Sequence, residues 1–230
     1  MAGFEGASQR HQVGCEIGAG KPALVVLSIN TMSESIPEQK AALRDRIRSE
    51  LKQIGPATRA SKSAQACLRL QEEPTWLRAR SVLLYSPLPD ELDIGPLWRD
   101  ALATGKELAL LRFGGEKQVY APCRVREPNY DLRPGRFGIM EPRPGCPEVP
   151  LKQLDFIVAP GVGFSLDGRR LGRGRGFYDR LLASVSGIKC GIAFDEQIVD
   201  AIPAEAHDIR LDYICTPTRW TGAGQRAVLK

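Results

Sequence analysis

The stretch from Asp155 to Leu182 (DFIVAPGVGFSLDGRRLGRGRGFYDRLL) constrains the fold of this 230-residue chain more than any other part of it. An apolar run at Leu154–Ala159 predicts a buried strand, and Phe177–Ser184 predicts an amphipathic helix. Two glycine clusters lie between them. A strand that leads through glycines into a helix is typical of an α/β fold, so we expect parallel strands alternating with helices.

The segment Arg170–Gly176 alternates cations with glycines. Because glycine has no Cβ, its backbone N–H can approach a phosphate directly, and the start of the following helix adds a partial positive charge. We therefore expect an anion rich in phosphate oxygens at this segment; a flexible surface loop with solvated arginines is the alternative. Five arginines fall within twelve residues: Arg169, Arg170, Arg173, Arg175 and Arg180.

This segment differs from the better-known nucleotide-binding loops. The chain has no G-x-x-x-x-G-K-[ST] motif, and neither glycine cluster completes the dinucleotide pattern G-x-G-x-x-G. At the position of the third glycine, one cluster has Leu166 and the other has Asp179. The phosphate-binding interpretation therefore depends on the glycines, the arginines and the helix, and not on a known motif.

The rest of the chain predicts a single-domain α/β fold. Seven prolines between Gly114 and Pro150 predict loops and short strands there. The other predicted elements are helices at 35–54, 59–70 and 93–104 and strands at 81–85, 107–111, 188–194 and 213–216. Strands that alternate with helices predict a mostly parallel sheet flanked by helices on both faces, with ligands bound beyond the carboxyl ends of the strands.

We interpret residues 1–31 as an N-terminal extension that need not be ordered, with a targeting peptide as the alternative. The α/β domain would occupy residues 32–222, and residues 223–230 would form a tail. No apolar run approaches the roughly 20 residues of a membrane helix. The sequence therefore predicts a protein without a membrane anchor, for which a cytoplasmic location and a monomer are the expectations.

Composition excludes several kinds of site. The six cysteines form no C-x-x-C pair, which argues against structural zinc and against a secreted disulfide framework. The two histidines are too few for a histidine-rich metal site. The formal charge of +5 is modest for a chain that binds long nucleic acid, so we expect a small anionic ligand and no nucleic acid.

Two cations share the inward face of the first helix. Lys40 and Arg44 are four residues apart, and helical geometry places them beside Ile47 and Leu51. Such cations must either extend to solvent or meet an anion. Together with the arginine segment, they favour a shared phosphate ligand.

Three acidic residues are candidates for metal or ligand binding. Asp179, in the first turn of the helix, could coordinate Mg²⁺ beside the phosphates, or it could only pair with Arg173 or Arg175. Asp208 is a second metal candidate or an ordinary turn residue. Glu91 follows a predicted strand, and the sequence does not decide whether it binds a polar ligand or caps the next helix.

The order of these motifs resembles the 5-formyltetrahydrofolate cyclo-ligase family over most of Pro37–Pro217. The resemblance is most specific in Arg-Leu-Gly-x-Gly-x-Gly-Phe-Tyr-Asp at 170–179. Weaker matches lie at Lys40-Ala-Ala-Leu-Arg44, at Glu91, at Gly138–Pro142 and at Ile202–Asp208. Membership would imply an enzyme that uses ATP and Mg²⁺ to convert 5-formyltetrahydrofolate to 5,10-methenyltetrahydrofolate, with release of ADP and phosphate.

The resemblance also implies a role for each candidate residue. Arg173 and Arg175 would be catalytic, and Asp179 and Asp208 would hold the metal. Arg44, Glu91 and Tyr178 would contact the folate. The residues implied in ATP binding are Lys40, Arg44, Arg170, Leu171, Gly172, Arg173, Gly174, Arg175, Gly176, Phe177 and Tyr178.

Two alternatives stay open on sequence alone. An RNA-binding module could use the Arg-Gly alternation, although such tracts usually form long repeats and not a short segment between a strand and a helix. An ATP-dependent enzyme of the same fold could act on another substrate.

Overall fold

The computed structural model describes residues 35–114, 119–135 and 138–223, and these residues belong to one compact unit. The expectations for residues 1–31 and for the tail from 224 lie outside the described residues. Within the described part, no helix is long and apolar enough to cross a membrane.

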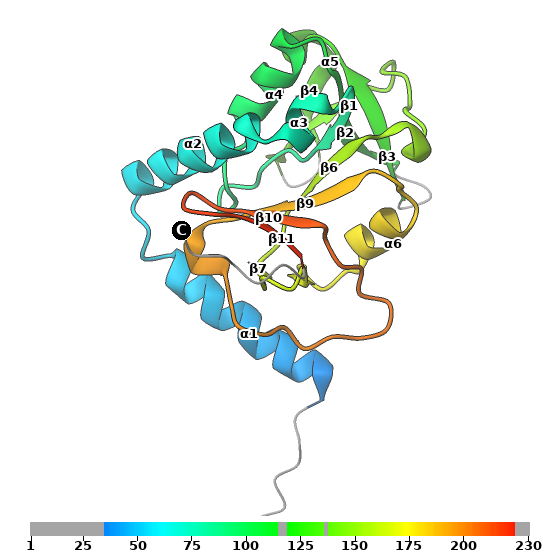
Figure 1. Cartoon of the computed structure of the whole chain (residues 1–230). Helices are drawn as coiled ribbons and strands as arrows, with labels where there is room; N and C mark the ends of the chain where they lie inside the picture. Colours follow the sequence, from blue (N-terminus) through cyan, green and yellow to red (C-terminus); the bar gives the residue numbers. More distant parts are fainter. Residues whose placement is uncertain (1–34, 115–118, 136–137, 224–230) are drawn as a thin grey trace, which may run out of the picture. The chain divides into compact units, whose positions relative to one another are not determined.

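A seven-stranded, mostly parallel sheet forms the centre of this unit, in the order β11-β10-β9-β6-β1-β2-β3 (Figure 1). Strands β10, β9, β6, β1 and β2 run parallel, and the two edge strands, β11 and β3, are antiparallel to their neighbours. The strands of this sheet are β1 (Ser81–Leu84), β2 (Glu107–Gly114), β3 (Val119–Val125), β6 (Phe156–Ala159), β9 (Ile188–Ile192), β10 (Tyr213–Cys215) and β11 (Trp220–Gly222).

Two short hairpins accompany the sheet: β4 (Leu132–Pro134) pairs with β5 (Met140–Pro142), and β7 (Gly163–Phe164) pairs with β8 (Arg170–Leu171). The α-helices are α1 (Ile36–Leu51), α2 (Pro56–Glu72), α3 (Pro74–Arg78), α4 (Gly95–Ala103), α5 (Pro128–Asp131) and α6 (Phe177–Ala183). Two 3₁₀ turns, η2 (Leu151–Gln153) and η3 (Asp195–Gln197), complete the elements.

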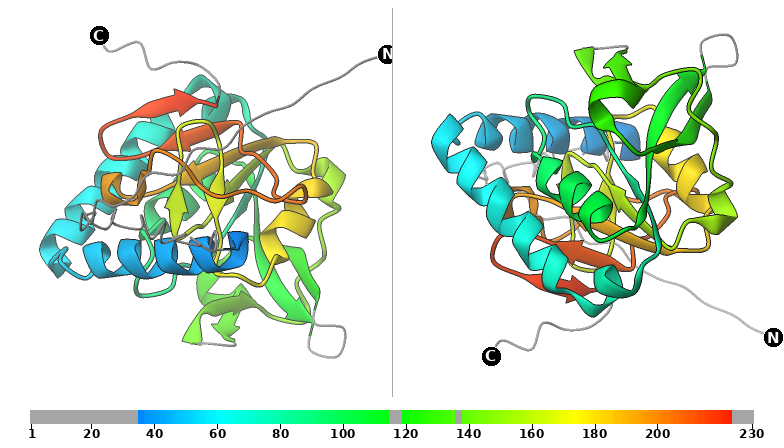
Figure 2. Two further views of the ribbon diagram at one scale, coloured as in Figure 1. Left: turned by 90° about the horizontal axis from the view of Figure 1, so that it is seen from below. Right: turned by 90° about the horizontal axis from the view of Figure 1, so that it is seen from above.

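Alternating side chains on the central strands build one apolar cluster on each face of the sheet. Val82 and Leu84 of β1 join the cluster that α1, α2 and α4 cover, whereas Leu83 joins the cluster covered by α6. Strand β6 alternates in the same way, and every residue of β1 and β6 is buried. Figure 2 shows α2 and α4 on one side of the sheet and α6 on the other. The expected α/β fold with both faces covered is confirmed.

Several elements differ from the expectations. The segment between Gly114 and Pro150, expected to hold only loops and short strands, contains the seven-residue strand β3, which extends the sheet beside β2. The glycine-rich stretch contains the β7–β8 hairpin and so does not lead directly from strand to helix. Helix α3 and strand β11, of five and three residues, were not predicted.

The start of α1 forms as its sequence predicts. Ser35 and Glu38 make the capping box, and Glu38 Oε2 accepts hydrogen bonds from both the N–H and the hydroxyl of Ser35. At Gly163 of β7, an added Cβ would lie 2.5 Å from Cδ1 of Ile47 in α1, so the end of that side chain would have to shift. Helix α1 thus packs closely against this hairpin.

Gly187, at the entry to β9, offers a test of the packing between β9 and β6. A Cβ at this position would lie against the Leu154 carbonyl and 2.6 Å from the Asp155 oxygen, and both atoms belong to backbone. We expect Gly187→Ala to lower the free energy of unfolding by about 2–3 kcal/mol, because backbone cannot rotate away as a side chain would. Gly145→Ala, where nothing lies within 4 Å of the added Cβ, should change it by less than about 0.5 kcal/mol in the same urea titration. Equal effects of the two substitutions would contradict this packing.

Candidate active site

Helix α1 and the glycine-arginine segment meet through Arg44. Its Nε donates a hydrogen bond of 2.8 Å to the Gly172 carbonyl, which fastens the helix to the segment between β8 and α6. Burial, with the nearby Arg48 as a second cause, lowers the pKa of Arg44. Gly174 lies beside the same guanidinium, so the two parts of the chain singled out from the sequence form a single surface.

Lys40 lies on the buried face of α1, as the helical spacing predicts, and it does not extend to solvent. Its side chain is 9% exposed, and its Nζ contacts Glu205 Oε2 at 2.8 Å and Asp208 Oδ2 at 2.7 Å. Burial alone would lower the pKa of Lys40, but the hydrogen bonds to the two carboxylates outweigh it and the pKa lies above its ordinary value. The anion that Lys40 meets here therefore comes from the segment between η3 and β10.

The ion pair with Lys40 also shifts the pKa of Asp208. Burial would raise its pKa, but the hydrogen bonds from Lys40 and from the Glu205 N–H hold the pKa of Asp208 below its ordinary value. The carboxylate is therefore ionised at neutral pH, as a metal ligand or an ammonium partner must be.

Arg170 and Asp179 form the most buried ion pair of the site. Arg170 Nη2 lies 2.9 Å from Asp179 Oδ1, and the two side chains are only 3% and 15% exposed. Arg170 Nη1 also donates to the Pro160 carbonyl at 3.3 Å, and its guanidinium lies 5.5 Å from the centre of the Tyr178 ring. The structure thus pairs Asp179 with Arg170. Arg173, one of the two expected alternative partners, bonds instead to the loop after β1.

Arg173 pairs with the loop that follows β1. Its Nη2 contacts Asp90 Oδ1 at 2.7 Å and Glu91 Oε1 at 3.0 Å, and its Nε donates to the same Glu91 oxygen at 3.1 Å. Burial would lower the pKa of Arg173, but the bond to Asp90 and the charge of Glu91 raise it above its ordinary value. The two ends of this contact are 82 residues apart in the chain.

Glu91 does not cap the helix that follows it. Helix α4 begins after Ile94 and has no side-chain cap, while the Glu91 carboxylate accepts hydrogen bonds from Arg173 and from the Leu88 N–H. Its side chain is 10% exposed and faces the glycine-arginine segment. The helix-capping interpretation of Glu91 is therefore wrong.

Aromatic rings lie beside these ion pairs. Phe177 packs against Tyr178 with ring centres 5.4 Å apart, and against Tyr120 of β3 at 4.2 Å. Burial, with the nearby Glu91 as a second cause, raises the pKa of Tyr178, so its hydroxyl stays protonated. Tyr120 was not among the sequence candidates, because the strand that carries it was not predicted.

The two proposed metal ligands lie in different ion pairs, Asp179 with Arg170 and Asp208 with Lys40. Among the described residues, the potential cation-binding group around Asp208 adds Glu205 and His207, with candidate ligand atoms within 4.8 Å of one another. The two carboxylates suit Mg²⁺, which prefers oxygen ligands. Glu205 and Asp208 are therefore suited to a magnesium ion, whereas the exposed His207 offers a nitrogen ligand.

Cysteine side chains offer no nucleophile in the part of the chain that the structure describes. All five of its cysteines are buried and free, and burial raises the pKa of Cys67 to about 12 and that of Cys123 to about 11. Protonated, enclosed thiols are poor nucleophiles. The arrangement instead suits chemistry in which cations stabilise negative charge.

Two further acids belong to this network although the sequence did not single them out. Asp90 and Glu205 each complete an ion pair with a predicted phosphate-binding cation. The only sequence signals were their positions, one residue before Glu91 and three residues before Asp208. Neither position identifies a partner, because both contacts are long-range.

Comparison with known proteins identifies the relatives of this chain. A profile described as the 5-formyltetrahydrofolate cyclo-ligase family matches residues 36–217. The 5-formyltetrahydrofolate cyclo-ligase of Escherichia coli K12 is 31% identical over 180 residues, which cover 75% of this chain and 97% of the relative. The 5-formyltetrahydrofolate cyclo-ligase of Mycolicibacterium smegmatis is 29% identical over 191 residues, which cover 80% and 96%.

Solved structures show the same fold. The 5,10-methenyltetrahydrofolate synthetase of Aquifex aeolicus is similar with a TM-score of 0.73 and 34% identity, covering 83% of this chain and 96% of that protein. The corresponding protein from Mycoplasma pneumoniae has a TM-score of 0.62 at 20% identity, covering 77% and 98%, and supports the fold alone. The matched region contains every ion pair described above.

The Arg170–Asp179 pair makes a direct prediction for stability. Asp179→Asn keeps the shape of the side chain but leaves a buried guanidinium without its counter-charge, which should lower the free energy of unfolding by about 3 kcal/mol. The matched control is Asp45→Asn, which removes an ion pair with Arg48 at a side chain that is 79% exposed and should cost less than about 1 kcal/mol. Urea unfolding monitored by circular dichroism measures both. A cost for Asp179→Asn no larger than the control would contradict a structural role for this pair.

Proposed function

The chain belongs to the 5-formyltetrahydrofolate cyclo-ligase family, and on this premise we propose that it converts 5-formyltetrahydrofolate and ATP to 5,10-methenyltetrahydrofolate, ADP and phosphate at the ion-pair site. The observation that carries the proposal is the contact of Arg44 on α1 with the glycine segment that lies between Arg170 and Tyr178; Lys40 lies one helical turn from Arg44. These cations come from segments 128 residues apart. Their meeting gives the polyphosphate of ATP a surface that no single loop provides.

The reaction requires charge stabilisation and positioning more than a protein nucleophile. The formyl oxygen attacks the γ-phosphate of ATP and ADP leaves; N10 then closes on the activated carbon, and phosphate departs. Negative charge on the phosphoryl oxygens grows in both steps, and guanidinium groups are suited to bind it. We assign this role to Arg173 and to the exposed Arg175 of the same segment, with Lys40, Arg44 and Arg170 binding ATP.

Backbone from Leu171 to Gly176 would complete the ATP site, because its glycines let amide groups approach phosphates. Gly174 and Gly176 have φ values of +96° and +60°, which other residues adopt only at a cost. Phe177 and Tyr178 follow at the start of α6 and would enclose the nucleotide. The folate would lie against Glu91, Tyr178 and Arg44.

We propose Mg²⁺ as the metal that accompanies ATP, with Asp179 and Asp208 as ligands and Glu205 beside Asp208. These residues would hold the ion, which would supply positive charge against the phosphate oxygens of ATP. Arg170 and Lys40 lie next to these carboxylates, Arg170 beside Asp179 and Lys40 beside Asp208.

A reducing compartment such as the cytosol suits the described cysteines, which are all free. We therefore propose that the enzyme works there.

The activity itself is tested by mixing the protein with 5-formyltetrahydrofolate, Mg²⁺ and ATP and following the methenyl chromophore. We expect product that depends on ATP and disappears when Mg²⁺ is chelated. ATP consumption with another formamide or carboxylate but not with the folate would favour a different substrate. Salt-sensitive RNA binding without ATP turnover would favour the RNA-binding alternative.

Arg173→Ala tests the assignment of charge stabilisation. We expect kcat to fall tenfold or more, since an interaction made mainly in the transition state contributes about 1.4 kcal/mol for each factor of ten. Arg126→Ala is a matched control, because Arg126 is exposed and follows β3, outside this site. Unchanged kcat and unchanged ATP affinity in Arg173→Ala would overturn the assignment.

A further inference from the structure

Arg173 directs its guanidinium at protein carboxylates. Its Nε and Nη2 groups donate three hydrogen bonds, two to Glu91 Oε1 and one to Asp90 Oδ1. A guanidinium binds a phosphate through the same N–H groups that it uses for a carboxylate. These bonds use three of the five N–H donors of the guanidinium, those of Nε and Nη2. A bidentate contact with a phosphoryl group needs at least one of these donors, so Arg173 must release a carboxylate to make it.

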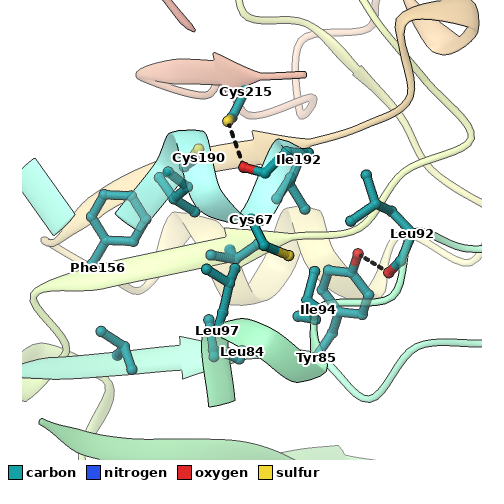
Figure 3. Close-up of a cluster of buried hydrophobic side chains, with 14 of the residues drawn as sticks. Cys67, Leu84, Tyr85, Leu92, Ile94, Leu97, Phe156, Cys190, Ile192 and Cys215 are labelled. Carbon is teal, nitrogen blue, oxygen red and sulfur yellow. Dashed lines mark hydrogen bonds between the residues drawn. The ribbon is translucent and has the colours of Figure 1, made fainter. Parts of the chain in front are cut away.

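The loop that carries Asp90 and Glu91 is held in place independently of Arg173. At the end of β1, the hydroxyl of the buried Tyr85 donates to the Leu92 carbonyl at 3.0 Å and so ties the two ends of the loop together (Figure 3). Glu91 and Leu88 also bond reciprocally, the Glu91 N–H to the Leu88 carbonyl and the Leu88 N–H to Glu91 Oε2. In addition, Arg59 donates to the Asp90 carbonyl. The carboxylates thus have fixed positions to which Arg173 can return.

Glu91 is the group for which the folate and Arg173 would compete. It is the proposed folate contact, and its Oε1 already accepts both bonds from Arg173, while Oε2 is bonded to the Leu88 N–H. A hydrogen-bond donor of the folate that reaches Glu91 must share or displace Arg173. Asp90, whose side chain is 55% exposed, would then hold the arginine without Glu91.

We propose that Asp90 and Glu91 form a carboxylate clasp on Arg173 that couples the two substrates, with Asp90 as the positioning residue that sets its strength. This inference rests on the proposed function. Folate binding at Glu91 loosens the clasp, and Arg173 then exchanges Asp90 for a phosphoryl oxygen of ATP. Asp90 does not touch either substrate and acts only through Arg173.

The clasp has a defined thermodynamic consequence. If only the open form presents Arg173 to phosphate, the apparent dissociation constant of the nucleotide equals its intrinsic value divided by the open fraction. Folate raises that fraction, so it must tighten nucleotide binding, and the nucleotide must tighten folate binding by the same factor. Weakening the clasp by mutation should tighten nucleotide binding and reduce the coupling.

The test measures binding of Mg²⁺ with the non-hydrolysable β,γ-imido analogue of ATP by calorimetry, with and without saturating 5-formyltetrahydrofolate. In the unmodified protein we expect the folate to lower the Kd of the analogue about fivefold or more. In Asp90→Asn the Kd without folate should already be about threefold lower than in the unmodified protein, and the folate effect should shrink accordingly. Asp200→Asn, which makes the same change of charge at an exposed site, should behave like the unmodified protein.

Arg173→Ala provides a second readout, because it removes the group that the clasp holds. In this background, Asp90→Asn should no longer change the Kd of the analogue. The clasp is wrong if Asp90→Asn leaves both Kd values unchanged, or if its effect persists without Arg173. Turnover of the unmodified protein distinguishes failure of the proposed function from failure of the clasp. If no methenyl product forms, the proposed function is wrong. If turnover is normal but Asp90→Asn leaves nucleotide binding unaltered, only the clasp is wrong.

Discussion

The buried ion pair between Arg170 and Asp179 fixes the geometry on which the site depends. It connects β8 to the first turn of α6, and the same guanidinium reaches the Pro160 carbonyl just beyond β6. Three parts of the chain are thus held by one side chain that is 3% exposed. The glycine segment between β8 and α6 is anchored at both ends by this pair, so its short backbone is positioned although its glycines favour no single conformation.

The positively and negatively charged side chains of the site are equal in number. Five cations, Lys40, Arg44, Arg170, Arg173 and Arg175, are accompanied by the carboxylates of Asp90, Glu91, Asp179, Glu205 and Asp208. Cations this close together repel one another, and the carboxylates offset that repulsion. The same oxygens are suited to a metal ion once phosphates supply the negative charge. The acids that balance these cations thus include the carboxylates that we propose as metal ligands.

The sequence predicted those helices and strands whose apolar residues repeat at a regular spacing. The 3.6-residue repeat placed Lys40 and Arg44 on the buried face of α1, and apolar runs located β1, β6 and β9. The pairing of charges was not predictable, because Arg173 meets residues 82 and 83 positions away and Lys40 meets residues 165 and 168 positions away. The order of the strands in the sheet and the connections between them bring such partners together. Neither can be read from the spacing of residues along the chain. The β7–β8 hairpin was missed for a related reason, since two-residue strands have no period.

An enzyme that activates a formyl oxygen with ATP must avoid spending ATP on water, and the clasp offers a physical means. While Asp90 and Glu91 hold Arg173, a bound nucleotide lacks one of the groups proposed to stabilise charge on its γ-phosphate. Stabilisation would be complete only when the folate occupies Glu91, that is, when the correct nucleophile is in place. Coupling of this kind uses substrate binding energy to assemble the catalytic site, and part of that energy is lost as binding affinity. The carboxylates around Arg173 therefore serve selectivity for the attacking group, at the expense of tight binding of ATP alone.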